Sequence, residues 1–360
     1  MGVKDKLKKA TEAVDKGSKI VADKAKVAGK AIGSGSVAAV NKAKSAGKAI
    51  GTGSKTAVTK TRAVVDTTHE ALVKAIDQDG NGMIDSTDLI IIALKVPGVK
   101  VNREVFLRKE LARHCSQEMI DCAVRETPAI AGIDPALIDK LVDETIKFER
   151  NAVSGISAVL GMPGGAAMVA TIPADIAQYY GYMLRAAQKM MYFYGFPELD
   201  ITGDGVNINT ETINSLTVCL GIMYGVANAN IAIKAMAKAF ATGVEKQLMR
   251  KALTKGTIYP IVKSIAKWFG KRMTKEIFAG FFKKAIPVVG GIVGGGLTYA
   301  TFKPCCNRLK KTLCNTSLSN LQYETTEEEE KVFEAIRDDK VVDVWPEELT
   351  EVNTTDTEEE

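Results

Sequence analysis

Three long stretches without a charged residue constrain the fold of this chain more than any other feature. They cover residues 153–174, 212–233 and 285–302 of the 360-residue sequence. Stretches of this length suit helices that are either buried or membrane-spanning. Each is interrupted, by a Met-Pro-Gly-Gly turn at 162–165, by Asn and Thr side chains, or by five glycines. We therefore predict an all-α protein built as a glycine-rich multi-helix bundle, and we keep an inserted membrane protein as an alternative.

The two ends of the chain carry opposite charge, which the formal net charge of +5 conceals. Residues 1–65 hold 15 Lys or Arg against 4 Asp or Glu, and residues 324–360 hold 16 acids against 3 bases. Segments this polar bury too little apolar surface to fold alone. We expect a basic arm at 1–63, disordered or helical only on a surface, and an acidic disordered tail at 320–360. The segment around Trp345 in this tail could dock on a protein partner or fold back on the basic arm.

The basic arm has the composition of a lipid-binding segment. Residues 24–65 lack any acid, and the sequence AGKAIG at 28–33 recurs 18 residues later at 46–51. An 18-residue offset is five helical turns, so both copies would share one face of a helix. Lysine-rich, weakly amphipathic helices form on anionic lipid surfaces. A nucleic-acid surface is less expected, because the arm lacks the interleaved aromatics of a single-strand binder.

A second basic region surrounds the glycine-rich stretch. Residues 246–311 contain 15 Lys or Arg and one acid, Glu276, with Trp and Phe among them. Basic residues beside Trp suit the headgroup level of a membrane, while a solvated face over a buried core is the alternative. The candidate membrane-binding residues are Lys263, Lys267, Trp268, Lys271, Arg272, Lys283 and Lys284.

Residues 77–89 read DQDGNGMIDSTDL and fit the calcium loop of an EF-hand. The predicted ligands use oxygen atoms at loop positions 1, 3, 5, 7, 9 and 12, with the sharp turn of position 6 at Gly82. Position 12 is Asp where sensor EF-hands use Glu, so we expect weak or structural Ca²⁺ binding. The candidate ligands are Asp77, Asp79, Asn81, Met83, Asp85 and Asp88.

A second acidic segment, residues 200–211, is a weaker calcium candidate. Its position 8 is Asn207, where an apolar residue should anchor the loop. The alternative is a turn between helices, followed by a helix N-cap at Asn209.

No catalytic motif is recognisable, and we assign no catalytic residue. The chain lacks GxSxG, a P-loop and HExxH. Its two histidines, His69 and His114, argue against a histidine-rich metal site and against most histidine-based triads. Asp175 and Arg185 lie among apolar residues, with Gln178 and Gln188 beside them. They could form a lipid-acting site or an inert hydrogen-bond network, and the network is the simpler interpretation.

Several motifs, in one order along residues 105–315, resemble the EcsC protein family. The resemblance implies an all-helical domain, and the family has no settled biochemical activity to carry over. The calcium loop and both charged ends lie outside it. The motifs are GMPGG at 161–165, ATIPADIAQYY at 170–180, RAAQK at 185–189, YGFPEL at 194–199, KALTKGTIYP at 251–260 and PVVGG to GLTYATF at 287–302.

Together these patterns predict an EF-hand at 64–97 followed by the EcsC-like domain at 105–315. The expected function is that of a calcium-binding, non-enzymatic protein that associates peripherally with anionic membranes. The first residues contain no apolar signal segment and the six cysteines form no CxxC pair, so we expect a cytoplasmic setting. An inserted membrane protein and a lipid-acting enzyme centred on Asp175 and Arg185 are the alternatives.

Overall fold

The computed structural model describes residues 73–78, 80–160, 172–201, 208–284 and 290–340. Within these ranges the chain forms helices and no strand, which confirms the all-α prediction. The predicted arm at 1–63 lies outside the described residues. The helices are α4 (Ser86–Leu94), α5 (Arg103–Leu111), α6 (Gln117–Arg125), α7 (Pro135–Leu160), α9 (Ile172–Phe193), α10 (Thr210–Tyr224), α11 (Ala229–Ala241), α12 (Lys246–Thr254), α13 (Tyr259–Lys284), α14 (Gly290–Leu313) and α15 (Glu327–Arg337).

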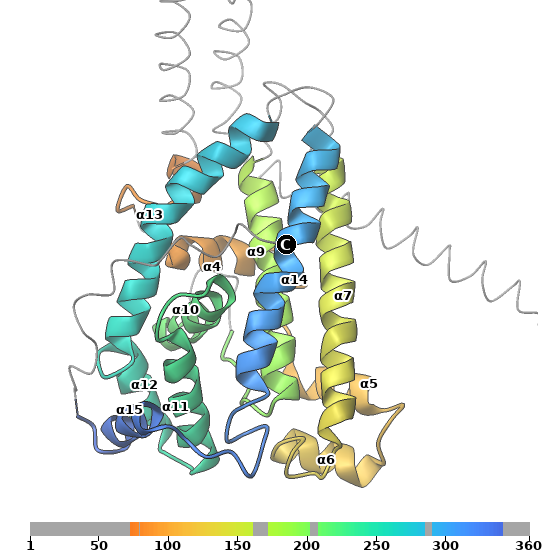
Figure 1. Cartoon of the computed structure of the whole chain (residues 1–360), viewed down its shortest axis with the longest axis vertical. Helices are drawn as coiled ribbons and strands as arrows, with labels where there is room; N and C mark the ends of the chain where they lie inside the picture. Colours follow the sequence, from red (N-terminus) through yellow and green to blue (C-terminus); the bar gives the residue numbers. More distant parts are fainter. Residues whose placement is uncertain (1–72, 79, 161–171, 202–207, 285–289, 341–360) are drawn as a thin grey trace, which may run out of the picture.

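Three long helices, α7, α9 and α14, run side by side and form one half of the bundle (Figure 1). Helices α10 and α11 pack beside them, and α13 covers the opposite side. The short helix α4 lies against α9, α10 and α13, so the segment predicted as an EF-hand shares the core of the predicted EcsC-like region. That common core runs without a break from Ile76 to Ile336.

Side-chain caps fix where several helices begin. Asn102 accepts a hydrogen bond from the Val105 amide at 2.9 Å, and Asn209 accepts one from the Thr212 amide at 2.7 Å. Such caps satisfy backbone amides that have no partner within the helix. The cap at Asn209 confirms the helix start predicted there, while residues 202–207 of the weaker calcium candidate lie outside the described part of the chain.

The second charge-free stretch is two core helices and not a membrane span. It divides into α10 and α11, and the turn between them places Gly225 at φ +73°. Nearly every side chain of α10 is buried, including the polar Thr212 and Asn214. Among the residues that the structure describes, no helix is long and apolar enough to cross a membrane.

The acidic segment at 327–337 folds as helix α15, so the prediction of a disordered tail from residue 320 is wrong for this part. Val332, Phe333 and Ile336 are buried against the core. Two lysines of α11 reach across to the acids: Lys234 contacts Glu329 at 3.0 Å, and Lys238 pairs with Glu330. Counting charge alone hid the apolar face of this helix. Residues 341–360 lie outside the described range.

A glycine turn at the end of α9 packs closely against two other segments of the bundle, at Thr127 and Leu318. Gly195 has φ +89°, and the Phe196 amide donates to the Met191 carbonyl at 2.9 Å, as in a Schellman motif. A β-carbon at Gly195 would lie 2.9 Å from Thr127 Cβ and 3.0 Å from the Leu318 carbonyl oxygen. Neither neighbour is the free end of a flexible side chain.

We therefore expect Gly195→Ala to lower the free energy of unfolding by about 2–4 kcal/mol. Positive φ costs a β-carbon about 1–2 kcal/mol, and overpacking adds about 1–3 kcal/mol. Gly155→Ala on α7 is the matched control, because open space surrounds that glycine and alanine is the better helix former. Urea denaturation measures both. An equal effect of the two substitutions would contradict the tight packing inferred at Gly195.

Candidate functional site

The predicted calcium loop closes around its first residue. Both carboxylate oxygens of Asp77 accept loop amides, from Gly80 at 2.7 Å and from Gly82 at 2.8 Å. Asn81 Oδ1 accepts the Met83 amide at 2.8 Å. Gly82 has φ +80°, the conformation expected of a glycine at the sharp turn. The turn of the loop therefore has the form that the sequence predicts.

The last two predicted ligands have a second role, as the cap of α4. Asp85 Oδ1 accepts the Thr87 amide at 2.6 Å and the Asp88 amide at 3.4 Å. Asp88 Oδ2 accepts the Asp85 amide at 2.9 Å, and the reciprocal bonds between Asp85 and Asp88 form a capping box. Asp88 is fully buried, and its other oxygen accepts the Gln78 amide at 2.7 Å. The backbone of the loop is thus tied to the helix that follows it.

The chemistry of these donors suits a hard divalent cation, since every predicted ligand offers oxygen. Their arrangement is less complete: Asp77, Asp85 and Asp88 do not converge into a metal-binding group, and Asp79 lies outside the described residues. Each carboxylate oxygen that accepts one amide keeps a second lone pair for an ion. Calcium binding at this loop therefore stays a prediction.

The loop adjoins helix α13, which carries the predicted membrane-binding residues. A β-carbon at Gly270 would lie 3.9 Å from the Ile84 carbonyl oxygen, so the two backbones approach closely there. Ile84 itself is buried in the core. Position 8 of the loop thus lies next to α13 at Gly270, between Lys267 and Lys271.

The predicted membrane-binding residues divide into three groups. Lys263, Lys267 and Lys271 are exposed and recur every four residues, which places them in one stripe along α13. Within the described part of the chain none of the three forms an ion pair. Trp268 instead turns toward the core, with its ring centroid 5.8 Å from that of Tyr224. The side chains of Arg272, Lys283 and Lys284 lie outside the described set.

The polar residues of the enzyme alternative all lie on one helix, α9. Asp175 and Arg185 are ten residues apart, about 15 Å along the axis, so they do not face each other across two helices. Gln188 is fully buried and binds the segment between α4 and α5, donating to the Val99 carbonyl at 3.0 Å and accepting the Val101 amide at 3.1 Å.

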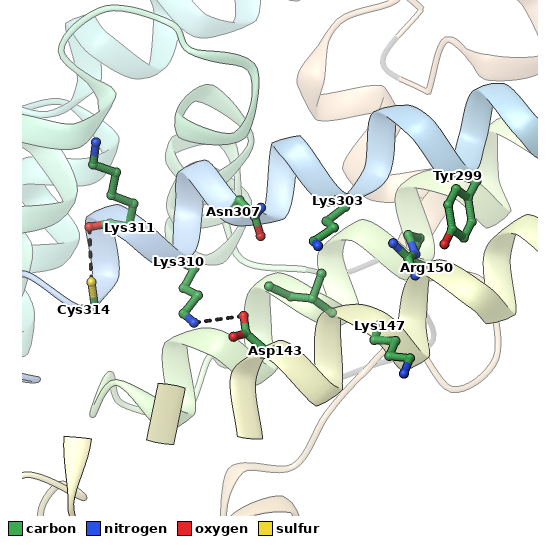
Figure 2. A pocket seen from close by; sticks show the side chains of 10 residues that line it. Asp143, Lys147, Arg150, Tyr299, Lys303, Asn307, Lys310, Lys311 and Cys314 are labelled. Carbon is green, nitrogen blue, oxygen red and sulfur yellow. Dashed lines mark hydrogen bonds and ion pairs between the residues drawn. The ribbon is translucent and has the colours of Figure 1, made fainter. Parts of the chain in front are cut away.

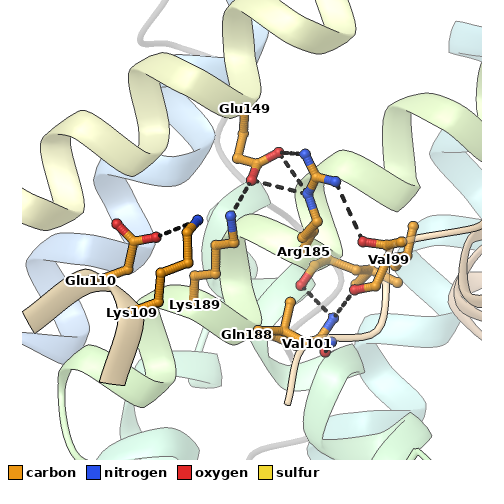
Figure 3. Close-up of polar contacts among 10 residues, drawn as sticks. Val99, Val101, Lys109, Glu110, Glu149, Arg185, Gln188 and Lys189 are labelled. Carbon is orange, nitrogen blue, oxygen red and sulfur yellow. Dashed lines mark hydrogen bonds and ion pairs between the residues drawn. The ribbon is translucent and has the colours of Figure 1, made fainter. Parts of the chain in front are cut away.

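The partner of Arg185 is Glu149 of α7, a residue that the sequence predictions missed (Figure 3). Arg185 Nε lies 2.9 Å from Glu149 Oε2, and Lys189 Nζ lies 2.8 Å from Oε1. Glu149 is fully buried, and both cations are about four-fifths buried. The sequence feature that could have identified Glu149 is its position in the apolar stripe of α7, which includes Val142, Ile146 and Val153. A carboxylate in such a stripe is buried and therefore needs a charged partner.

This cluster resembles a structural ion network more than a reaction centre. Both oxygens of Glu149 are bound by cations. Two buried cysteines are not activated as nucleophiles either, since burial raises the pKa of Cys219 to about 12 and that of Cys305 to about 11. The cluster joins α7 to α9, and we assign it that role.

The chain matches no protein-family model, no curated protein and no solved structure.

Glu149→Gln should strongly destabilise the fold. Removing this charge leaves two mostly buried cations without their counter-ion, and breaking a buried ion pair from one side typically costs about 3–5 kcal/mol. The control is Asp121→Asn, which removes a carboxylate from the surface pair with Arg108. Water and salt screen that pair, so its loss should matter far less. Urea denaturation compares the two variants, and equal midpoints would show that Glu149 does not anchor the bundle.

Proposed function

We propose that this protein binds calcium and associates peripherally with anionic membranes, without catalysing a reaction. The observation that carries the proposal is the close approach of the predicted calcium loop to Gly270, on the helix that carries the exposed lysine stripe. A charged loop and a basic stripe on neighbouring elements support a cation site beside a lipid-binding surface. The support is the geometry of the described residues and the charge of the sequence.

The stripe has the right physical character for a membrane surface. Lys263, Lys267 and Lys271 are exposed and free of carboxylate partners in the described structure, so their charges are available to lipid phosphates. Each lysine near an anionic surface contributes about 1 kcal/mol. The stripe is too weak to hold the protein alone, and the basic arm at 1–63 would add to it.

Calcium would be held by the oxygens of the loop, with the carboxylates of Asp77, Asp79, Asp85 and Asp88 as the charged ligands. The ion would supply positive charge beside α13 and fix the loop against that helix. Because Asp88 is shorter than the usual Glu and already binds two amides, the affinity should be modest.

Membrane binding should depend on the stripe and not on total charge. Replacing Lys263, Lys267 and Lys271 together by Gln should weaken flotation with phosphatidylserine vesicles about 100-fold, the equivalent of about 3 kcal/mol. The matched control replaces three exposed lysines elsewhere, Lys109, Lys140 and Lys331. An equal loss in both triple variants, or no loss in either, would contradict the proposal.

Calcium should raise the melting temperature of the full chain, measured by calorimetry in calcium and then in chelator. At a hundredfold excess over Kd the gain is about 2.7 kcal/mol, or roughly 5 °C for a protein of this size. Asp79→Asn should reduce the gain, and magnesium should give less of it than calcium. An unchanged melting temperature in calcium would contradict the proposed calcium binding. Flotation repeated in chelator then shows whether the ion controls attachment.

A further inference from the structure

A basic groove lies between α7 and α14 and contains none of the candidate calcium ligands or candidate membrane-binding residues (Figure 2). Its volume is about 720 Å³, within the range of small-molecule sites. Both walls are long helices that pack on each other directly. The residues that matter to the argument are Lys147 and Arg150 from α7 and Tyr299, Lys303, Asn307 and Lys311 from α14.

Helical spacing places these side chains on the two facing surfaces. Tyr299, Lys303, Asn307 and Lys311 follow one another at four-residue intervals along α14. Lys147 and Arg150 are three residues apart on α7. The groove is therefore lined by one continuous face of each helix, and neither wall depends on a loop.

The positive charge of the groove is largely uncompensated. Asp143 is its acidic lining residue, and that carboxylate is already bound by Lys310 at 2.9 Å. Lys147, Lys303 and Lys311 are exposed, and the described structure gives none of them an ion pair. With Arg150, four cations line the groove, and among the described residues none of them is paired with a carboxylate.

Arg150 is held in place like an anion-binding residue. Its guanidinium carbon lies 3.9 Å from the centre of the Tyr299 ring, a cation–π contact that fixes the plane of the group. Among the described residues, its Nε–H is buried without a hydrogen-bond partner, and Nη2 donates to Asn151 Oδ1 at 3.3 Å. Burial has removed water from this one donor, and no described carboxylate pairs with the guanidinium, so an anion in the groove would supply the missing counter-charge.

We propose that this groove binds a ligand with at least two phosphate groups, such as an inositol phosphate. Lys303 and Lys311 are eight residues apart, about 12 Å along the helix, which is longer than one phosphate can bridge. Planar guanidinium and lysine ammonium groups are the usual partners of phosphate oxygens. Asn307 and the half-exposed Tyr299 add neutral hydrogen-bonding groups for ring hydroxyls.

An inositol ring with several phosphates can come from a free inositol phosphate or from a phosphoinositide headgroup in a membrane. The phosphoinositide would deepen the proposed function by naming a lipid, and this part of the inference rests on that function. Binding of a free inositol phosphate would be independent of membranes. The lysine stripe of α13 and this groove share no residue, so each can be changed separately.

The test is calorimetric titration of the full chain with inositol trisphosphate, followed by flotation with vesicles that contain phosphatidylinositol bisphosphate. Lys147→Gln with Lys303→Gln should lower trisphosphate affinity at least about tenfold, since each removes a charge-assisted contact. Lys140→Gln with Lys331→Gln is the control of equal charge change, at exposed lysines outside the groove. Arg150→Lys keeps the charge and should still lose affinity, because the stacked planar fork is gone.

If the groove variant (Lys147→Gln with Lys303→Gln) loses trisphosphate affinity and its control does not, the result supports the site. If soluble trisphosphate then inhibits flotation, the lipid headgroup is also a ligand. Trisphosphate binding without flotation supports the free ligand. Binding to neither probe, or equal loss in the groove variant and its control, overturns the inference. The groove variant should still float with phosphatidylserine vesicles. The α13 triple variant should still bind trisphosphate, so failure of one proposal is distinguishable from failure of the other.

Discussion

The buried carboxylate of Glu149 is the interaction on which the arrangement of the bundle depends. A charge in the apolar stripe of α7 is tolerable only if α9 presents Arg185 and Lys189 to it, so it fixes how these two helices meet. Between these two cations on α9, the buried Gln188 binds the segment that joins α4 to α5. Helix α14 packs on α7 and forms the basic groove. The α7–α9 pairing therefore positions one wall of the groove and the helix against which α4 packs.

The sequence was sufficient for the fold class, and it was insufficient where polar residues depend on distant partners. Caps such as Asn209 are local, and the pattern of residues predicts them correctly. Glu149 and Arg185 are 36 residues apart, so the sequence around either residue does not identify its partner. Helix α15 was not predicted from the sequence for a related reason. Its acids are neutralised in part by Lys234 and Lys238 of α11, which a local count of charge does not include.

The predicted calcium loop shows why a motif of acidic residues is ambiguous on its own. A carboxylate at the start of a helix can cap amides or bind an ion, and both roles require the same oxygens in the same direction. Asp85 and Asp88 cap α4 in the described structure, which explains their spacing without an ion. Asp77 and the two glycines at positive φ are harder to explain by capping alone, because they shape a turn before the helix begins. This turn, more than the acidic residues, favours a cation site.

The lysine stripe of α13 and the basic groove between α7 and α14 differ in how well they can distinguish one anion from another. The lysines of α13 are exposed on flexible side chains, so salt screens them and any anionic surface satisfies them. Arg150 is stacked on Tyr299 and has lost water from one donor, so its geometry is set before a ligand arrives. A preorganised cation discriminates between anions of different shape, whereas a flexible one responds mainly to their charge. The stripe therefore suits attraction to a membrane in general, and the groove suits the choice of one phosphorylated ligand.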